Sequence, residues 1–318
     1  MAGGLPVGRL PLCPADGGPA DGGPAEGVPP GVARWGALPS HLVPDHQADE
    51  VTGATEATSL GGDLLYEAVN GVARITINRP ERRNAMSWEV VRGLREALAT
   101  AKADPDVRVV VLAGAGDQAF CAGADLGGMI EGADFLTLHE ARGVLAEVFG
   151  DLWGLGKPTV ARVQGWALAG GFGLALACDM VLASDRARFG APEINVGLWP
   201  HMVTVPMVRS MPPKKALELM LTGRVVDAAE ADRIGFVTRV VPHEELDSAV
   251  DELAATLAGK SPSVMKLGRG GFYAVWDMEA SDALALLHAM LTLNGQTQDA
   301  AEGISAFLEK RPPKWSGR

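Results

Sequence analysis

Cysteine is scarce in this chain, with Cys13, Cys121 and Cys178 among 318 residues. No two of them form a CxxC pair, and none lies near a histidine at metal-ligand spacing. This pattern argues against a disulfide framework or a metal site, and we expect ordinary thiols. It also gives no sign of an oxidising compartment.

Long apolar runs and an excess of positive charge are also missing. No run approaches the roughly 20 apolar residues that span a bilayer, and the N-terminus lacks the charged-then-apolar order of a signal peptide. Lys and Arg number 28 against 39 Asp and Glu, which gives a net charge of −11. This balance argues against broad attraction to nucleic acid or to an anionic membrane. We therefore expect a cytoplasmic protein without either partner.

Residues 1–60 differ in composition from the rest of the chain. They contain the degenerate repeat PADGGPADGGPAEGVPPG, rich in Pro, Gly, Ala and acidic residues. Such a segment buries too little apolar surface to offset the entropy of ordering, so we expect a disordered extension. It is interpreted as a dispensable tail, with a partner-binding tail or a start codon set too far upstream as alternatives.

From about Leu64 the pattern alternates strands with helices. Asn70-Gly71 between two apolar alternating runs predicts a hairpin. Ser87 is a plausible N-cap for a helix whose apolar residues follow helical spacing. Apolar runs predict buried strands at residues 107–114, 158–165 and 179–184. This alternation predicts a layered α/β domain, with a mostly helical remainder from about Pro212.

Two glycine-rich stretches are the first candidates for a reactive site. AFCAGADL (119–126) follows a predicted strand, and LAGGFGLALA (168–177) opens a helix at its glycine pair. Small residues allow a backbone to approach a ligand closely, and a helix N-terminus offers free N–H groups. One N–H from each stretch could form an oxyanion hole. Tight packing of helix on strand is the alternative.

These stretches, taken with others, resemble the crotonase family, the enoyl-CoA hydratase/isomerase superfamily, from about residue 63 to residue 315. The matching segments are ITINRPERRNAMS, AFCAGADL, KPTVARVQGWALAGGFGLALACD, ARFGAPEINVGLWP, ALELMLTGRVVDAAEADRIGFVTRVVP and FLEKR. The resemblance implies an α/β spiral of ββα turns over 61–260, which binds acyl-CoA. It also implies a helical region over 261–318 that builds homotrimers, which pair into homohexamers.

The resemblance also implies roles for individual residues. The thioester carbonyl would be held by the backbone N–H groups of Ala124 and Gly170. Coenzyme A enters as part of the substrate, with no metal and no separate cofactor. The residues implied to contact it are Arg82, Arg83, the backbone of Cys121 and Ala122, and, from a neighbouring subunit, Phe307 and Lys310.

The carboxylates separate this chain from the family's hydratases, which use two glutamates. The second corresponds to Glu193, and the first corresponds to Gly173. Partial burial in an apolar stretch would raise the pKa of Glu193 toward the working pH of a proton shuttle. A glutamate restored at position 173 could clash with His201 or Trp199.

His201 marks a second departure, because family members that hydrolyse 3-hydroxyacyl-CoA carry aspartate at this place. A histidine there could act as a second acid or base, line the pocket or serve a structural role. One base suffices for a 1,3-proton shift, so we expect isomerisation of an enoyl-CoA double bond. The alternatives are hydration or dehydration, 3-hydroxyacyl-CoA thioester hydrolysis, and CoA-ester binding without catalysis.

Overall fold

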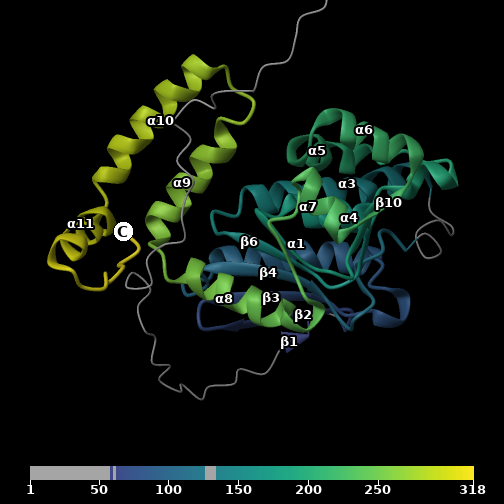
Figure 1. The fold of residues 1–318 in the computed structure, drawn as a ribbon, viewed down its shortest axis with the longest axis horizontal. Helices are drawn as coiled ribbons and strands as arrows, with labels where there is room; N and C mark the ends of the chain where they lie inside the picture. Colours follow the sequence, from purple (N-terminus) through teal and green to yellow (C-terminus); the bar gives the residue numbers. More distant parts are fainter. Residues whose placement is uncertain (1–57, 60–61, 126–133) are drawn as a thin grey trace, which may run out of the picture. The chain divides into compact units, whose positions relative to one another are not determined.

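The computed structural model describes residues 58–59, 62–125 and 134–318 (Figure 1). The expected extension, residues 1–60, therefore lies outside the described residues, except for Thr58 and Ser59. Among the described residues no helix is long and apolar enough to cross a membrane.

In the part of the chain that the structure describes, seven strands form the larger sheet. In spatial order they are β1 (Thr58–Ser59), β2 (Leu64–Val69), β3 (Val72–Ile77), β4 (Val109–Gly114), β6 (Thr159–Val163), β8 (Met180–Ser184) and β11 (Arg239–Val241). The strands from β3 to β11 are parallel, and the expected hairpin joins β2 to β3. Its turn residues Asn70 and Gly71 have φ of 50° and 80°, as a type I′ turn requires.

A smaller sheet contains β10 (Val225–Asp227), β9 (Arg188–Gly190), β7 (Trp166–Leu168) and β5 (Ala119–Cys121), in that order. Strands β5, β7 and β9 are parallel, and each follows directly on a strand of the larger sheet. Adding the helices that follow, α3 (Phe135–Trp153), α4 (Gly170–Ala177) and α5 (His201–Ser210), gives three successive ββα units. The spiral of ββα turns expected from the sequence is thus confirmed.

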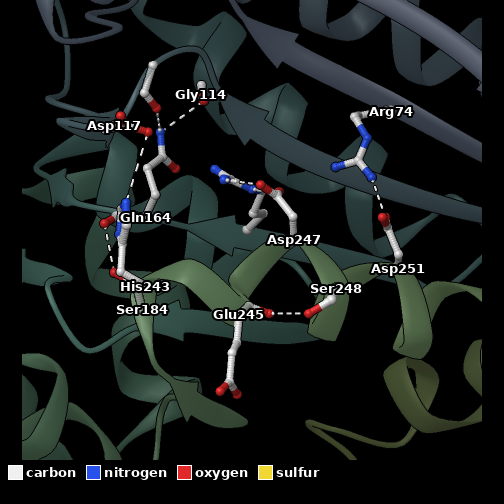
Figure 2. A network of polar contacts seen from close by, with 12 residues as sticks. Arg74, Gly114, Asp117, Gln164, Ser184, His243, Glu245, Asp247, Ser248 and Asp251 are labelled. Atoms are coloured by element: carbon white, nitrogen blue, oxygen red, sulfur yellow. Dashed lines mark hydrogen bonds and ion pairs between the residues drawn. The ribbon is translucent and has the colours of Figure 1, made fainter.

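Gln164 fixes the corners at which the chain passes from the larger sheet to the smaller one (Figure 2). Its buried amide donates to the carbonyl oxygens of Gly114, Gly116 and Ala119 at 2.9, 3.0 and 2.7 Å, all at the first corner. The backbone carbonyl of Gln164 accepts a hydrogen bond from the Ser184 hydroxyl at 2.8 Å, at the third corner. The side chain of Gln164 therefore fixes the first corner, and its backbone connects the second corner to the third.

Helices cover both faces of the larger sheet. Alternate residues of β4 divide between two cores: Leu112 packs with α1 (Trp88–Ala103), and Val111 packs with α8 (Leu246–Ala258). The predicted cap is confirmed, because the Ser87 hydroxyl accepts from Val90 N at 3.3 Å. Two further helices, α6 (Pro213–Thr222) and α7 (Ala228–Ile234), complete this part, with 3-10 turns η2 (Pro80–Arg82), η3 (Pro192–Val196) and η4 (His243–Glu245).

Three helices form the C-terminal region: α9 (Pro262–Ala274), α10 (Ala280–Gly295) and α11 (Gln298–Glu309). Helix α9 is held on the core by Arg269, which donates to the Asp179 carboxylate at 2.8 Å and to the carbonyls of Leu152 and Trp153 at 2.6 and 2.8 Å. Tyr273 also donates to Asp179, at 2.5 Å. The ion pair therefore also caps the end of α3.

The last residues of the chain fold back onto the start of α9 through Asp299. This buried carboxylate accepts from the hydroxyls of Ser261 and Ser263 at 2.6 and 2.9 Å, and from Ser316 N at 2.7 Å. Burial acts to raise its pKa, but these hydrogen bonds outweigh burial and lower the pKa to about 2. The C-terminal region is thus closed on itself by one carboxylate.

Much of the apolar surface of α10 and α11 remains exposed within one chain. An apolar groove of about 1120 Å³ is lined by α9, α11 and residues of the core. The exposed apolar residues on α10 and α11 are Leu284, Leu287, Leu291, Leu293, Ile304, Phe307 and Leu308. Contiguous apolar surface of this kind is typical of a protein interface.

Strand β1 lies within residues 1–60, the segment predicted as an extension, and its Thr58 and Ser59 pair with Tyr66 and Leu65. We expect a chain that begins at Thr58 to keep the melting temperature and turnover of the full chain, because residues 1–57 lack a core-forming pattern. Thermal melting and steady-state kinetics of both forms measure this. A large fall in either quantity would show that the extension contributes to the folded protein.

Candidate active site

The predicted site residues come from the carboxyl ends of three neighbouring parallel strands. Ala124 follows β5, Gly170 follows β7 and Glu193 follows β9, and these strands are adjacent in the smaller sheet. The carboxyl ends of parallel strands share one edge, where ligands of open α/β sheets bind. Strand pairing thus brings together three positions that are far apart in sequence.

The peptide between Gly123 and Ala124 is held in a fixed orientation by Met86. The Gly123 carbonyl accepts from Met86 N at 2.8 Å, and Asp125 N donates to the Met86 carbonyl at 2.9 Å. Because C=O and N–H point in opposite directions in a trans peptide, the Ala124 N–H points away from Met86. Within the described residues this N–H has no hydrogen-bond acceptor, which leaves it available to a ligand.

The turn before Gly170 is strained and well supported. Ala169 has φ of 51° and ψ of −127°, a conformation that costs a residue with a side chain about 1–3 kcal/mol. Its N–H donates to the Gly190 carbonyl at 2.9 Å, which connects this turn to the strand before Glu193. The turn places Gly170 at the start of α4, where backbone N–H groups have no partner within the helix.

Gly123 allows the two donor segments to approach each other. Its φ is 101°, and a Cβ atom at this position would lie 2.8 Å from the Ala169 Cβ and 3.6 Å from Gly170 N. The segments that carry the Ala124 and Gly170 N–H groups are therefore in direct contact. This arrangement can donate two hydrogen bonds to one developing oxyanion.

Glu193 supplies a carboxylate with an unusual environment. Its side chain is half-buried, and its Oε2 atom is buried with no hydrogen-bond partner in the described part of the chain. Burial raises the pKa of this carboxyl above its ordinary value, although a hydrogen bond from its own backbone acts in the opposite direction. A carboxylate desolvated in this way is a stronger base than an ordinary glutamate.

The position of the second acid is closed by apolar side chains. A Cβ atom at Gly173 would lie 2.8 Å from Phe149 Cζ and 3.0 Å from Val203 Cγ2, and both side chains are buried. The nearest neighbours of a Cβ atom at Gly173 are thus Phe149 from α3 and Val203 from α5. The clash of a longer side chain with His201 or Trp199 stays a prediction. Leu145, one turn before Phe149, lies against Gly170.

The arginines implied to contact coenzyme A lie beside the Ala124 segment. Arg82 is exposed and pairs with Asp125 at 3.2 Å, and the Arg83 carbonyl accepts from Ala122 N at 3.0 Å. Cys121 is buried, and burial raises the pKa of its thiol to about 12, so the thiol stays protonated. The predicted residues 82, 83, 121 and 122 are therefore neighbours.

The other predicted residues lie apart from this group. His201 is the exposed first residue of α5, and within residues 134–318 no hydrogen bond or ion pair joins its ring to Glu193. Phe307 lies in the last turn of α11 and is exposed, and Lys310 is the C-cap of this helix. Their roles stay predictions.

Sequence reasoning missed the wall of the site. Phe149 and Leu145 are four residues apart on α3, and this spacing identifies an apolar helix face but not its neighbour. It also missed Arg79, a buried arginine that pairs with Asp125 at 2.9 Å. An arginine before a proline in a polar loop gives no sign of burial.

Comparison with known proteins shows consistent similarity. The family model described as Enoyl-CoA hydratase/isomerase matches residues 67–318. A Thermus thermophilus protein with an enoyl-CoA hydratase assignment is 40% identical over 248 residues, which cover 77% of this chain and 97% of the relative. The Enoyl-CoA hydratase domain-containing protein 3 of Rattus norvegicus is 34% identical, over 78% of this chain and 82% of the relative.

Solved structures agree with this similarity. The crystal structure of an enoyl-CoA hydratase from Mycobacterium smegmatis has a TM-score of 0.77 and 35% identity, covering 80% of this chain and 98% of the other. The human enoyl-CoA hydratase domain-containing protein 3 has a TM-score of 0.77 and 30% identity, covering 80% of this chain and 100% of the other.

Glu193 gives the first test of the site. We expect Glu193→Gln to bind an acyl-CoA with nearly the parent affinity and to lower turnover by about 10²- to 10⁴-fold, the usual contribution of general acid–base catalysis. In the parent, kcat/KM should rise with pH through an apparent pKa above 4.5, because burial raises this pKa and the base acts deprotonated. Isothermal titration and pH-dependent kinetics measure both. Parent-like turnover in the variant would remove Glu193 from the mechanism.

Proposed function

Because the chain belongs to the enoyl-CoA hydratase/isomerase family, we propose that it moves the double bond of an enoyl-CoA, with Glu193 as its acid and base. The observation that carries this proposal is the apolar filling around Gly173. Where the family's hydratases place a second glutamate, Phe149 and Val203 occupy the space that its side chain would need.

The site's own groups suffice for a 1,3-proton shift. The Ala124 and Gly170 N–H groups would hold the thioester oxygen, and each such donor contributes roughly 2.7–4 kcal/mol to transition-state stability. Glu193 would remove a proton from C2, the hole would stabilise the enolate, and the same carboxyl would return the proton at C4. The reaction consumes no water and leaves the carboxylate ready for another cycle.

Hydration is the second candidate, because relatives from Thermus thermophilus and Mycobacterium smegmatis are assigned as enoyl-CoA hydratases. Hydration needs water activated at C3 while a proton reaches C2. In this chain position 173 offers no carboxylate, and the buried Phe149 and Val203 offer no polar atom to hold that water. Isomerisation needs neither a second carboxylate nor an activated water at this site.

The proposal extends to coenzyme A and to assembly. Arg82 is exposed beside the Ala124 segment, as Arg83 is, and a guanidinium suits phosphate because its donors are forked. The exposed apolar residues of α10 and α11 support assembly into homotrimers or homohexamers. In such an assembly Phe307 and Lys310 would contact the coenzyme A bound to a neighbouring subunit. A cytoplasmic location stays a prediction.

The direct test is to incubate the protein with 2-enoyl-, 3-enoyl- and 3-hydroxyacyl-CoA thioesters in deuterated water and to follow them by mass spectrometry. We expect 3-enoyl- and 2-enoyl-CoA to interconvert, with deuterium incorporated and no water added. Net addition of water would favour hydration, release of free coenzyme A would favour hydrolysis, and an unchanged panel would favour binding without catalysis.

A second test restores the missing acid together with room for it. Gly173→Glu alone should destabilise the fold, because its Cβ already meets Phe149 at 2.8 Å. In the double variant Gly173→Glu/Phe149→Ala we expect the ratio of hydration to isomerisation to rise above that of Phe149→Ala, which serves as the matched control. Close carboxylates raise each other's pKa, so the pH optimum should move upward.

If the double variant folds and binds the thioester but shows the control's ratio, then the absent glutamate does not separate this chain from a hydratase. Melting temperatures of both variants show whether the comparison is valid.

A further inference from the structure

Asp125, the residue that follows Ala124, binds two arginines. Its carboxylate pairs with Arg79 Nη2 at 2.9 Å and with Arg82 Nη1 at 3.2 Å. The Asp125 and Arg79 side chains are 13% and 10% exposed, whereas Arg82 is 58% exposed. Asp125 therefore connects a buried arginine to an arginine at the surface.

Arg79 is fixed by further contacts. Its Nη1 donates to the Ala85 carbonyl at 2.6 Å, and its Nε pairs with Asp63 at 2.9 Å. Ala85 precedes Met86, whose N–H and carbonyl hold the Gly123–Ala124 peptide and Asp125 N. The Asp125–Arg79 pair thus spans the two segments whose pairing orients the Ala124 N–H.

We propose that Asp125 is a positioning residue that fixes the Ala124 N–H toward the thioester oxygen and connects this donor to the coenzyme A-facing Arg82. This inference rests on the proposed function, because it assumes that Ala124 is an oxyanion donor. In this role the carboxylate would act through its pairs with Arg79 and Arg82 and not on the reacting atoms.

The geometry separates two effects of Asp125. Through Arg79 it supports the bridge between Met86 and Ala124, and loss of this support should lower kcat for every thioester. Through Arg82 it orients a group that meets the nucleotide, and this effect should appear in KM for coenzyme A thioesters. An acyl-pantetheine thioester lacks the nucleotide and reports the first effect alone.

The experiment compares Asp125→Asn with the parent on 3-enoyl-CoA and 3-enoyl-pantetheine. We expect kcat to fall roughly 10- to 100-fold with both substrates, because a displacement of about 1 Å can reduce the rate about 100-fold. Arg82→Gln should raise KM for the coenzyme A thioester and leave kcat and KM for the pantetheine thioester near the parent values. Asp247→Asn, which removes the Arg162–Asp247 pair on the larger sheet, is the matched control and should leave kcat unchanged.

A binding measurement separates this inference from the proposed reaction. Butanoyl-CoA labelled with carbon-13 at its carbonyl does not isomerise, and its infrared carbonyl stretch moves to lower frequency when the oxygen accepts hydrogen bonds. The parent and Asp247→Asn should show the same lowering, and Asp125→Asn should show less. A parent without lowering would overturn the oxyanion site itself, and with it this inference.

A further outcome is that the parent shows the lowered carbonyl frequency while Asp125→Asn has the same frequency and the same kcat. In that case the positioning role of Asp125 is wrong, although the oxyanion site itself is supported. If Asp125→Asn does not fold, Arg79→Lys replaces it, because lysine keeps the charge but cannot reach Asp63, Ala85 and Asp125 together. A smaller lowering in Arg79→Lys supports the role, and a parent-like stretch overturns it.

Discussion

The site depends on the parallel alignment of three short strands that end at one edge. Strands β5, β7 and β9 are too short to set their own register, with three residues each. Their alignment comes from the corners that connect them to the larger sheet, where the Gln164 amide bonds to three carbonyls. This side chain is fully buried, so replacing it would leave carbonyl groups without partners in the interior.

Strain and close packing follow from that alignment. Two backbones must approach closely enough to direct N–H groups at one oxygen, and this requires glycine at 123 and a left-handed φ at Ala169. The strain at Ala169 is held by its hydrogen bond to Gly190, which also fixes the strand that leads to Glu193. The candidate donors and the candidate base are thus positioned by one connected backbone.

Two carboxylates at the site, those of Glu193 and Asp125, differ in the polar groups that surround them. The Glu193 carboxylate is desolvated and its Oε2 lacks a partner among the described residues, which raises its pKa. Asp125 lies in a comparable position beside Ala124, but hydrogen bonds and charge from Arg79 and Arg82 outweigh burial and lower its pKa. Two carboxylates at one strand edge therefore have pKa values that shift in opposite directions, which suits Glu193 to the proposed proton transfer and keeps Asp125 charged.

The sequence by itself determined the order of the ββα units, the hairpin at Asn70-Gly71, the cap at Ser87 and the candidate donors and base. The hairpin and the cap depend on local propensity and on hydrophobic period, which act over a few residues. The ββα units and the candidate donors and base were predicted from the resemblance of several sequence motifs to the crotonase family. Tertiary structure decided that Phe149 and Val203 fill the space at Gly173, that Arg79 is buried against Asp125, and that β1 belongs to the sheet. Contacts between segments tens of residues apart cannot be identified from the local sequence. The apolar period of a helix shows which face is buried, but it is the same whichever element packs on that face.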